Sequence, residues 1–228
     1  MTVLVVSGTG TEIGKTIVTA AVAAASGGRV AVLKPAQTGL APGDHGDAAE
    51  VARLAGGEVT AVELARYPEP LAPATAARRS GLSPVRPYEI AETAQKLATE
   101  HDLVLVEGAG GLLVRFDDEG ATLADAARLL AAPVLLVVAP GLGTLNATAL
   151  TAEALRARGL ACPGVVIGSM PADPDLATRC NVEDLPVAAG APLLGVLPAG
   201  AGSLRPADFR TGARTWLSPE LGGTWGRR

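Results

Sequence analysis

Continuous apolar runs, separated by helix-length segments, are the feature that most limits how this chain can fold. The runs occupy residues 3–6, 30–33, 103–106, 134–138, 164–167 and 193–197 and are rich in β-branched residues. A run that does not alternate with polar residues is typical of a strand buried on both faces. Stretches with helical spacing lie between the runs, at residues 16–25, 47–55, 88–100, 123–130 and 145–158. The pattern predicts a doubly wound α/β fold, a mostly parallel sheet with helices on both faces.

Length and composition restrict the organisation and the partners. At 228 residues, we expect positions 1–228 to form a single domain whose last forty residues supply a closing strand, a loop and a loosely defined helix. The net charge of −4, without long basic runs, argues against nucleic acid as a partner. Cys162 and Cys180 lack the spacing of a metal site or disulfide framework. With no leader and no membrane-length apolar run, we expect a cytoplasmic protein that does not bind membranes.

A glycine-rich segment, Gly8–Thr16, joins the first apolar run to the first helical stretch. A strand, a glycine turn and a helix start together aim backbone N–H groups and the positive helix end at one point, which holds an anion. Lys15 adds a cation, and the Thr16 hydroxyl suits Mg²⁺. Thr9 stands where the usual G-x4-G-K-[ST] motif has its first glycine. A plain connecting turn is the alternative, but this context favours a nucleoside triphosphate site.

Two charged residues follow later runs, at the sheet edge where ligands of such folds bind. Lys34 precedes Pro35, which keeps it extended, so a second ammonium group is directed toward the phosphate loop. Glu107 precedes Gly108–Gly111 and offers a carboxylate to Mg²⁺ bound to phosphates. A snorkelling lysine and an ion-paired glutamate are the respective structural alternatives.

Residues around position 47 have two interpretations. Asp47 opens a helix and has Glu50 three positions on, which is the pattern of a capping box, so the pattern alone favours capping over a functional role. We expect His45, in the preceding loop, and His101 to be solvated rather than catalytic.

Two further segments remain open from pattern alone. Residues 141–148 follow a strand and open a helix, so their free N–H groups could hold a carboxylate, or Thr144 could simply cap the helix. Residues 67–73 carry Pro68, Pro70 and Pro73 and form either a rigid surface loop or a substrate contact.

Taken together and in order, these motifs resemble the dethiobiotin synthetase family over about residues 1–205. The motifs are Gly8–Thr16, Lys34–Gly39, Tyr67–Pro73, Glu107–Gly111 and Gly143–Asn146. The resemblance implies a ligase that forms the ureido ring of dethiobiotin from 7,8-diaminononanoate, CO2 and a nucleoside triphosphate such as ATP, with Mg²⁺. It also implies formation of a carbamate, its phosphorylation, and ring closure with loss of phosphate. The family is a homodimer with substrate at the subunit interface.

The resemblance also implies residue roles. Lys34, Lys15 and Thr11 are catalytic, with Thr11 and Thr38 hydrogen-bonding the substrate. Mg²⁺ is bound by Thr16, Asp47 and Glu107, which favours the ligand interpretation of Asp47. The substrate carboxylate is held by Gly143, Thr144, Leu145 and Asn146. The nucleotide contacts are Glu12, Ile13, Gly14, Lys15, Thr16, Ile17, Glu107, Gly108, Ala109, Gly110, Gly168, Ser169, Pro198, Ala199 and Gly200.

Two departures from familiar patterns affect these expectations. Gly168–Pro171 replaces the Asn-Arg pair with which many relatives read adenine, and the loop at Leu197–Gly200 is built from small residues. We therefore expect relaxed base choice, with CTP or GTP competing with ATP. The rival class is the partitioning-type P-loop ATPase switch, which has a lysine where this chain has Gly10 and often a basic amphipathic helix at its C-terminus. Neither feature is present, so we favour the ligase.

Overall fold

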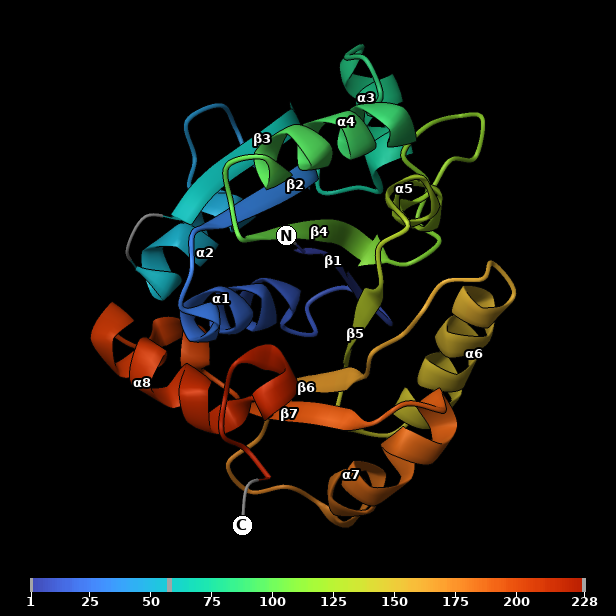
Figure 1. Ribbon diagram of the computed structural model, residues 1–228. Helices are drawn as coiled ribbons and strands as arrows, with labels where there is room; N and C mark the ends of the chain where they lie inside the picture. The colour runs from blue at the N-terminus through green and yellow to red at the C-terminus, as the bar shows by residue number, and fades with distance from the viewer. Residues whose placement is uncertain (1, 57–58, 227–228) are drawn as a thin grey trace.

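A parallel sheet organises the part of the chain that the structure describes, residues 2–56 and 59–226 of a computed structural model. Its seven strands lie in the order β3-β2-β4-β1-β5-β6-β7, with β1 in the middle (Figure 1). All pairings between these strands are parallel. The strands are β1 (Thr2–Gly8), β2 (Val30–Thr38), β3 (Val59–Tyr67), β4 (Leu103–Gly111), β5 (Val134–Val138), β6 (Val165–Met170) and β7 (Leu193–Pro198).

Helices cover both faces of the sheet (Figure 1). One face packs against α1 (Lys15–Ser26), α2 (Asp47–Ala55) and α8 (Pro206–Trp216). The other packs against α3 (Pro73–Ser80), α4 (Pro87–Ala98), α5 (Leu123–Leu130), α6 (Thr144–Arg156) and α7 (Leu176–Ala189). Two short 3-10 helices, η1 (Ala201–Ser203) and η2 (Pro219–Leu221), flank α8.

The two faces of the sheet bury separate apolar cores. In β1, Val5 contributes to the core beneath α4 and α5, whereas Leu4 and Val6 contribute to the core beneath α1 and α2. Because both sets of side chains are covered, the strand reads as an uninterrupted apolar run. The predicted doubly wound α/β fold is confirmed.

The edge strand β3 was not predicted, because its residues are mostly half-buried rather than continuously apolar. Its pairing also explains why β2 is longer than the run at 30–33. The register of β2 with β4 ends at Leu33↔Val106, while its register with β3 continues to Thr38↔Tyr67. Pro35, which has no N–H to give, is skipped in that register. Lys34–Thr38 is therefore strand, not the segment after one.

Several other elements also differ from expectation. Gly108–Gly111, expected to follow the strand, continues β4 alongside β1. Helices α3 and α7 were not predicted; α7 even accommodates Pro186. The last forty residues contain the expected strand and a well-formed α8, in which the rings of Phe209 and Trp216 meet edge to face, 5.5 Å apart.

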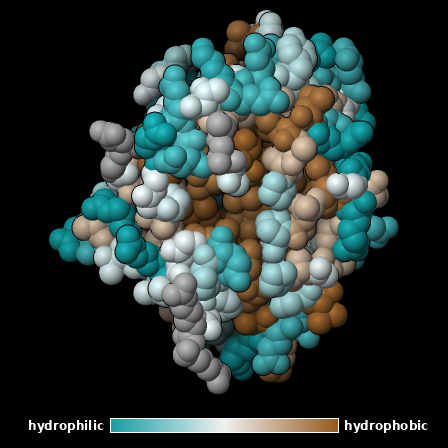
Figure 2. Space-filling view, in the orientation of Figure 1, coloured by the Kyte–Doolittle hydropathy of each residue, from teal (hydrophilic) through white to brown (hydrophobic). Residues whose placement is uncertain are grey.

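The surface has a mixed character. On the face shown in Figure 2, apolar residues form a band through the middle and hydrophilic residues lie toward the rim. Within residues 2–56 and 59–226, no helix combines the length and apolarity that crossing a membrane requires.

Candidate active site

A cavity of about 950 Å³ opens at the carboxyl ends of β1, β2 and β4. This is the edge of the sheet where the topology of such folds places ligands. Most of the predicted phosphate, metal and catalytic residues line it. They are Thr11, Glu12, Gly14, Lys15, Thr16, Ile17, Lys34, Thr38, Asp47, Glu107, Ala109 and Gly110.

The phosphate loop is shaped by a close backbone contact. Gly14 precedes α1 with φ of 93°, a left-handed conformation that favours glycine. A Cβ atom on Gly14 would lie 2.4 Å from the Gly168 carbonyl oxygen, and one on Gly168 would lie 2.1 Å from that of Ile13. The end of β6 thus packs directly against the loop, and both glycines are needed for that approach.

Lys15 spans the phosphate loop. Its Nζ donates a 2.7 Å hydrogen bond to the carbonyl of Gly10, so the position where a switch ATPase would carry lysine here supplies an acceptor. Burial of the side chain, together with the nearby charge of Lys34, lowers the pKa of Lys15. The backbone of the loop therefore fixes the position of its lysine.

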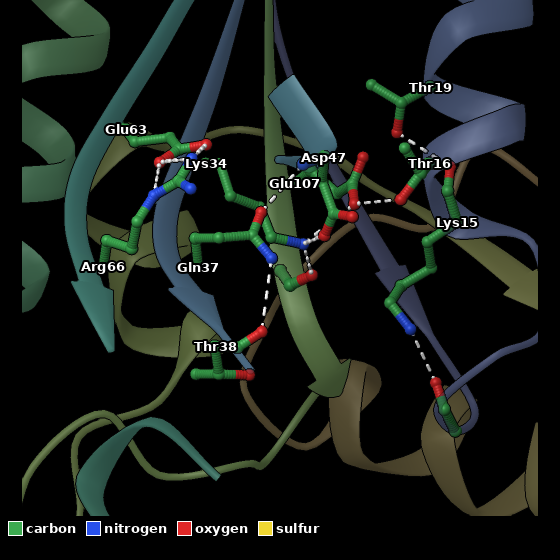
Figure 3. Close-up of polar contacts among 12 residues, drawn as sticks. Lys15, Thr16, Thr19, Lys34, Gln37, Thr38, Asp47, Glu63, Arg66 and Glu107 are labelled. Atoms are coloured by element: carbon green, nitrogen blue, oxygen red, sulfur yellow. Dashed lines mark hydrogen bonds and ion pairs between the residues drawn. The ribbon is translucent and has the colours of Figure 1, made fainter. Parts of the chain in front are cut away.

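Lys34 lies at the centre of the polar cluster, between two carboxylates (Figure 3). Its Nζ is 2.5 Å from Asp47 Oδ2 and 2.9 Å from Glu107 Oε1, and it also donates to the carbonyl of Gly108 at 3.1 Å. Burial by itself would lower the pKa of Lys34. The attraction and hydrogen bonds of Glu107 and Asp47 outweigh that effect, so the pKa is raised and the side chain remains an ammonium ion.

The sheet register explains how a lysine comes to be buried here. Lys34 and Glu107 each stand one residue beyond the last β2–β4 pair, Leu33↔Val106. Where the two strands separate, their side chains meet instead of their backbones. Lys34 is only 3% exposed and Glu107 is fully buried, so the ion pair is a built feature rather than a snorkelling contact.

The oxygen donors predicted to bind Mg²⁺ converge in this cavity. Thr16 Oγ1 donates to Glu107 Oε1 at 2.9 Å, and the other oxygen, Glu107 Oε2, is buried without a partner. An unpartnered buried carboxylate oxygen beside a hydroxyl and the Asp47 carboxylate fits a hard cation. No cluster of three or more His, Cys, Asp or Glu side chains suited to a metal occurs in the described ranges. Two carboxylates and a hydroxyl match Mg²⁺ that is also bound to phosphates.

The capping interpretation of Asp47 is wrong. Gly46 is the N-cap of α2, Asp47 is the first helical residue, and its carboxylate contacts Lys34. Glu50, the expected capping partner, instead binds Arg53 and the exposed His45. Asp47 is thus free of a capping role, and its side chain faces the cavity.

The start of α6 lies apart from this cavity. None of the residues in Gly143–Asn146 lines it. The N-cap is Gly143, with φ of 86°, and Thr144 is the first helical residue with a buried, unpartnered hydroxyl, so a Thr144 cap is also wrong.

The proline-bearing loop and the expected base-side segments have distinct positions. Pro70, Leu71 and Pro73 line the cavity, with Leu71 exposed. Neither Gly168–Ser169 nor Pro198–Gly200 lines it. These two segments lie together, because the Ala199 N–H donates to the Met170 carbonyl at 2.7 Å, and Gly168 contacts the phosphate loop.

Sequence reasoning missed several residues around the cavity, notably Gln37, Leu40 and Val114. It also missed Glu63 and Arg66, which form an ion pair on β3. Gln37 lies within the Lys34–Gly39 motif, and that position was the signal for it. Glu63 and Arg66 carried no signal, because β3 itself was not recognised, and Leu40 and Val114 lie outside every quoted motif.

The parallel sheet, the glycine loop at the carboxyl end of its central strand and the lysine within that loop define an α/β P-loop nucleotide-binding protein. A family model described as AAA domain matches residues 2–206. The fold is similar to that of a ParA family ATPase from Chlorobium tepidum, with a TM-score of 0.58 at 13% identity, covering 97% of this chain and 96% of that one. It is also similar to MinD in the MinC:MinD complex of Aquifex aeolicus, with a TM-score of 0.55 at 16% identity and coverage of 93% and 86%. These likenesses concern the fold alone.

Sequence comparison identifies the family within that class. The chain is 70% identical to the ATP-dependent dethiobiotin synthetase BioD of Streptomyces avermitilis, over 99% of this chain and 95% of that protein. It is also 70% identical to the protein of that name from Saccharopolyspora erythraea, over the full length of both. The protein belongs to the dethiobiotin synthetase family. The predicted family is confirmed, and the switch ATPase is not favoured.

Proposed function

We propose that this protein forms the ureido ring of dethiobiotin from 7,8-diaminononanoate, CO2 and a nucleoside triphosphate, as an enzyme of biotin biosynthesis. The observation that carries the proposal is the meeting of Lys34 with Thr16, Asp47 and Glu107 in the cavity beside the phosphate loop. The membership of this chain in the dethiobiotin synthetase family supports it.

The proposed reaction has three steps. One amine of the substrate adds to CO2 and loses a proton, giving a carbamate. A carbamate oxygen then attacks the γ-phosphorus, and the nucleoside diphosphate leaves. Finally the second amine attacks the carbonyl carbon of this mixed anhydride, inorganic phosphate leaves, and a proton is lost as the ring closes.

The residues of the cavity would act mainly through charge and position. The carbamate and the transferring phosphoryl group are both anionic, so two fixed ammonium groups lower the barrier by stabilising them together. Lys34 would stabilise the carbamate and its anhydride, and Lys15 would bridge phosphate and carbamate oxygens. Thr11 and Thr38 would hydrogen-bond the amine-bearing end of the substrate.

Thr16, Asp47 and Glu107 would hold Mg²⁺, which supplies charge neutralisation on the phosphates. Lys34 contacts both carboxylates of this set. Asp47 and Glu107 would therefore link the metal site to the carbamate site.

We also propose a cytoplasmic homodimer. The start of α6 offers the positive end of a helix and the unpartnered Thr144 hydroxyl but does not line the cavity of its own chain. It would hold the substrate carboxylate at the subunit interface. Light scattering coupled to size exclusion measures the mass, and a monomer at micromolar concentration with full activity would contradict the proposal. The free Cys162 and Cys180 accord with a reducing compartment.

We infer that the protein discriminates only weakly between the bases of different nucleoside triphosphates. The segments near the phosphate loop, Gly168–Ser169 and Pro198–Gly200, have no side-chain amide to read adenine. Binding through backbone groups and apolar contact separates bases poorly, so CTP and GTP should compete with ATP. Steady-state kcat/KM values for the three nucleotides test this, and a preference for ATP of about a hundredfold over each of the others would contradict it.

The activity itself is tested by incubating the protein with Mg²⁺, ATP, bicarbonate and 7,8-diaminononanoate. The expected products are dethiobiotin, detected by mass, and one ADP for each ring formed. ATP hydrolysis that continues without dethiobiotin would show that the protein is not this ligase.

Lys34→Gln separates chemistry from nucleotide binding. Loss of an ammonium group that contacts the reacting anions is expected to lower kcat by about 100- to 1000-fold. Affinity for the nucleotide should change little, as measured by calorimetry. Lys96→Gln, on the exposed surface of α4, is the matched control and should behave as wild type. An equal loss of nucleotide affinity in Lys34→Gln would assign Lys34 to the phosphate site instead.

A further inference from the structure

The loop that delivers Asp47 to the cavity is fastened from the edge strand β3. Residues 39–46 connect β2 to α2. Arg66, on β3, donates from Nη1 to the carbonyls of Ala41 at 3.1 Å and Asp44 at 2.7 Å. One guanidinium group thus ties two points of the loop, and a point charge such as lysine could not reproduce that geometry.

Arg66 is itself fixed by Glu63. Its Nε and Nη2 atoms donate to the two carboxylate oxygens of Glu63, at 3.0 and 2.9 Å. A bidentate pair of this kind is among the more rigid side-chain contacts, and here both partners are largely buried. The pair lies beside the Lys34 cluster, on the neighbouring strand β3 (Figure 3). The guanidinium is therefore held in a fixed orientation.

The far end of the loop is held by Gln37, the registered neighbour of Arg66 across the β2–β3 pair. Its side-chain oxygen accepts a 2.8 Å hydrogen bond from the Asp47 N–H. That N–H is one of the groups at a helix start that lack partners within the helix. Gln37 thus caps α2 from a strand, and this leaves the Asp47 carboxylate available to the cavity.

The surroundings of Gly46 show that the loop packs against the Glu63–Arg66 ion pair. Its φ of −92° is open to any residue, so the backbone conformation does not demand glycine. A Cβ atom there would lie 2.3 Å from Glu63 Oε1 and 2.7 Å from Arg66 Nη2. The loop therefore rests directly on the ion pair, and a side chain at position 46 would press on it.

We propose that Arg66, oriented by Glu63 and assisted by Gln37, is a positioning residue that fixes Asp47 for metal binding. The inference rests on the proposed role of Asp47 in holding Mg²⁺. Arg66 contacts neither the metal donors nor the phosphate loop in the described structure; it acts through the carbonyls of Ala41 and Asp44. The edge strand thereby forms part of the metal site.

The test replaces Arg66 by Met and follows metal binding and loop order separately from activity. We expect the Kd for Mn²⁺, titrated by electron paramagnetic resonance with ADP present, to rise by about tenfold, as for other residues that orient metal ligands. Amide hydrogen exchange in residues 41–47 should accelerate, while exchange in β1 and β4 stays slow. Arg66→Lys should recover little, because it cannot reach two carbonyls and Glu63 together.

The matched control is Arg205→Met, which removes an exposed Arg–Asp pair at the start of α8. It should alter neither readout. If Arg66→Met fails to fold, Gly46→Ala keeps both charged residues but forces the loop and the ion pair apart, and it should change both readouts in the same direction. Unchanged Mn²⁺ affinity in Arg66→Met would overturn the inference, whether or not exchange in residues 41–47 accelerates.

Asp47→Asn separates this inference from the proposed function. If Asp47→Asn weakens Mn²⁺ binding and Arg66→Met does not, only the positioning role fails. If Asp47→Asn leaves Mn²⁺ binding unchanged, the metal role of Asp47 fails, and the positioning role fails with it. Absence of dethiobiotin with the wild-type protein would overturn the proposed reaction, whereas both metal titrations would remain readable.

Discussion

Single residues in this protein are constrained by what lies within a few ångströms of them. Lys34 is tolerated inside the protein because Asp47 and Glu107 surround its ammonium group. Gly14 is required for two reasons, its left-handed backbone and its contact with Gly168. The second reason is visible only in the folded chain, and it can be separated from the first by experiment.

The two glycines that bound α1 allow that separation. Gly27, after the helix, has φ of 71° and open space where a Cβ would lie, so Gly27→Ala should cost about 1 kcal/mol of unfolding free energy from backbone strain. Gly14→Ala combines that strain with a clash against Gly168, which should add about 1–3 kcal/mol. Urea unfolding measures both. Equal losses for the two variants would show that the loop can yield to Gly168 freely.

At the scale of elements, the N–H donors at the start of a helix can be capped by a distant residue or by a local one. Gln37 serves α2 from another strand, whereas α7 is served locally by Asp175, whose carboxylate accepts from the Thr178 N–H at 2.7 Å. That backbone hydrogen bond lowers the pKa of Asp175. A capping pattern in the sequence finds the second kind of start and misses the first.

The cap of α7 leads to a prediction about how the thermal stability depends on pH. The pKa of Asp175 is lower in the folded than in the unfolded chain. Its cap therefore stabilises the folded state fully at pH values above the pKa of the unfolded chain, and this stabilisation is lost as the pH falls through the pKa of the folded chain. Asp175→Ala should lower Tm at pH 7, and the difference from wild type should shrink in acid. Asp173→Ala, two residues earlier and also exposed, should show no such trend. A Tm difference that stays constant down to acid would refute the assignment.

At the scale of the whole molecule, one sheet supports two cores. Leu135 and Leu136 are consecutive in β5, fully buried, and belong to opposite cores. Neither core can form without the sheet that separates them. We therefore expect residues 1–228 to unfold as one cooperative unit, as a single domain would.

Alanine substitutions at Leu135 and Leu136 test whether the two cores unfold together. Leu135→Ala and Leu136→Ala should each cost about 2–5 kcal/mol, because both leave a cavity in a packed interior. Circular dichroism and tryptophan fluorescence should report coincident transitions for both variants, since the Trp side chains and the sheet unfold together. Separate transitions for the two probes would mean that the cores are independent.

The predictable part of the protein follows from signals that are local in sequence. The apolar runs predicted the buried strands and the fold class, and the Gly8–Thr16 loop predicted the phosphate site. The edge strand β3 escaped, because a half-buried strand has no continuous apolar run. The boundaries at Lys34 and Glu107 were also misplaced, since strand length depends on pairing partners that lie far away in sequence.

The sequence by itself determined the family, the parallel sheet and the types of residue proposed to meet the phosphates, because each depends on composition or spacing along a short stretch. Only the tertiary structure decided that Asp47 faces Lys34 instead of capping its helix, and that Arg66 and Glu63 support the loop before it. The physical reason is that a carboxylate is bound by the nearest compensating charge in space. That charge is brought there by the pairing of β2 with β4 and β3, a relation that no local pattern records.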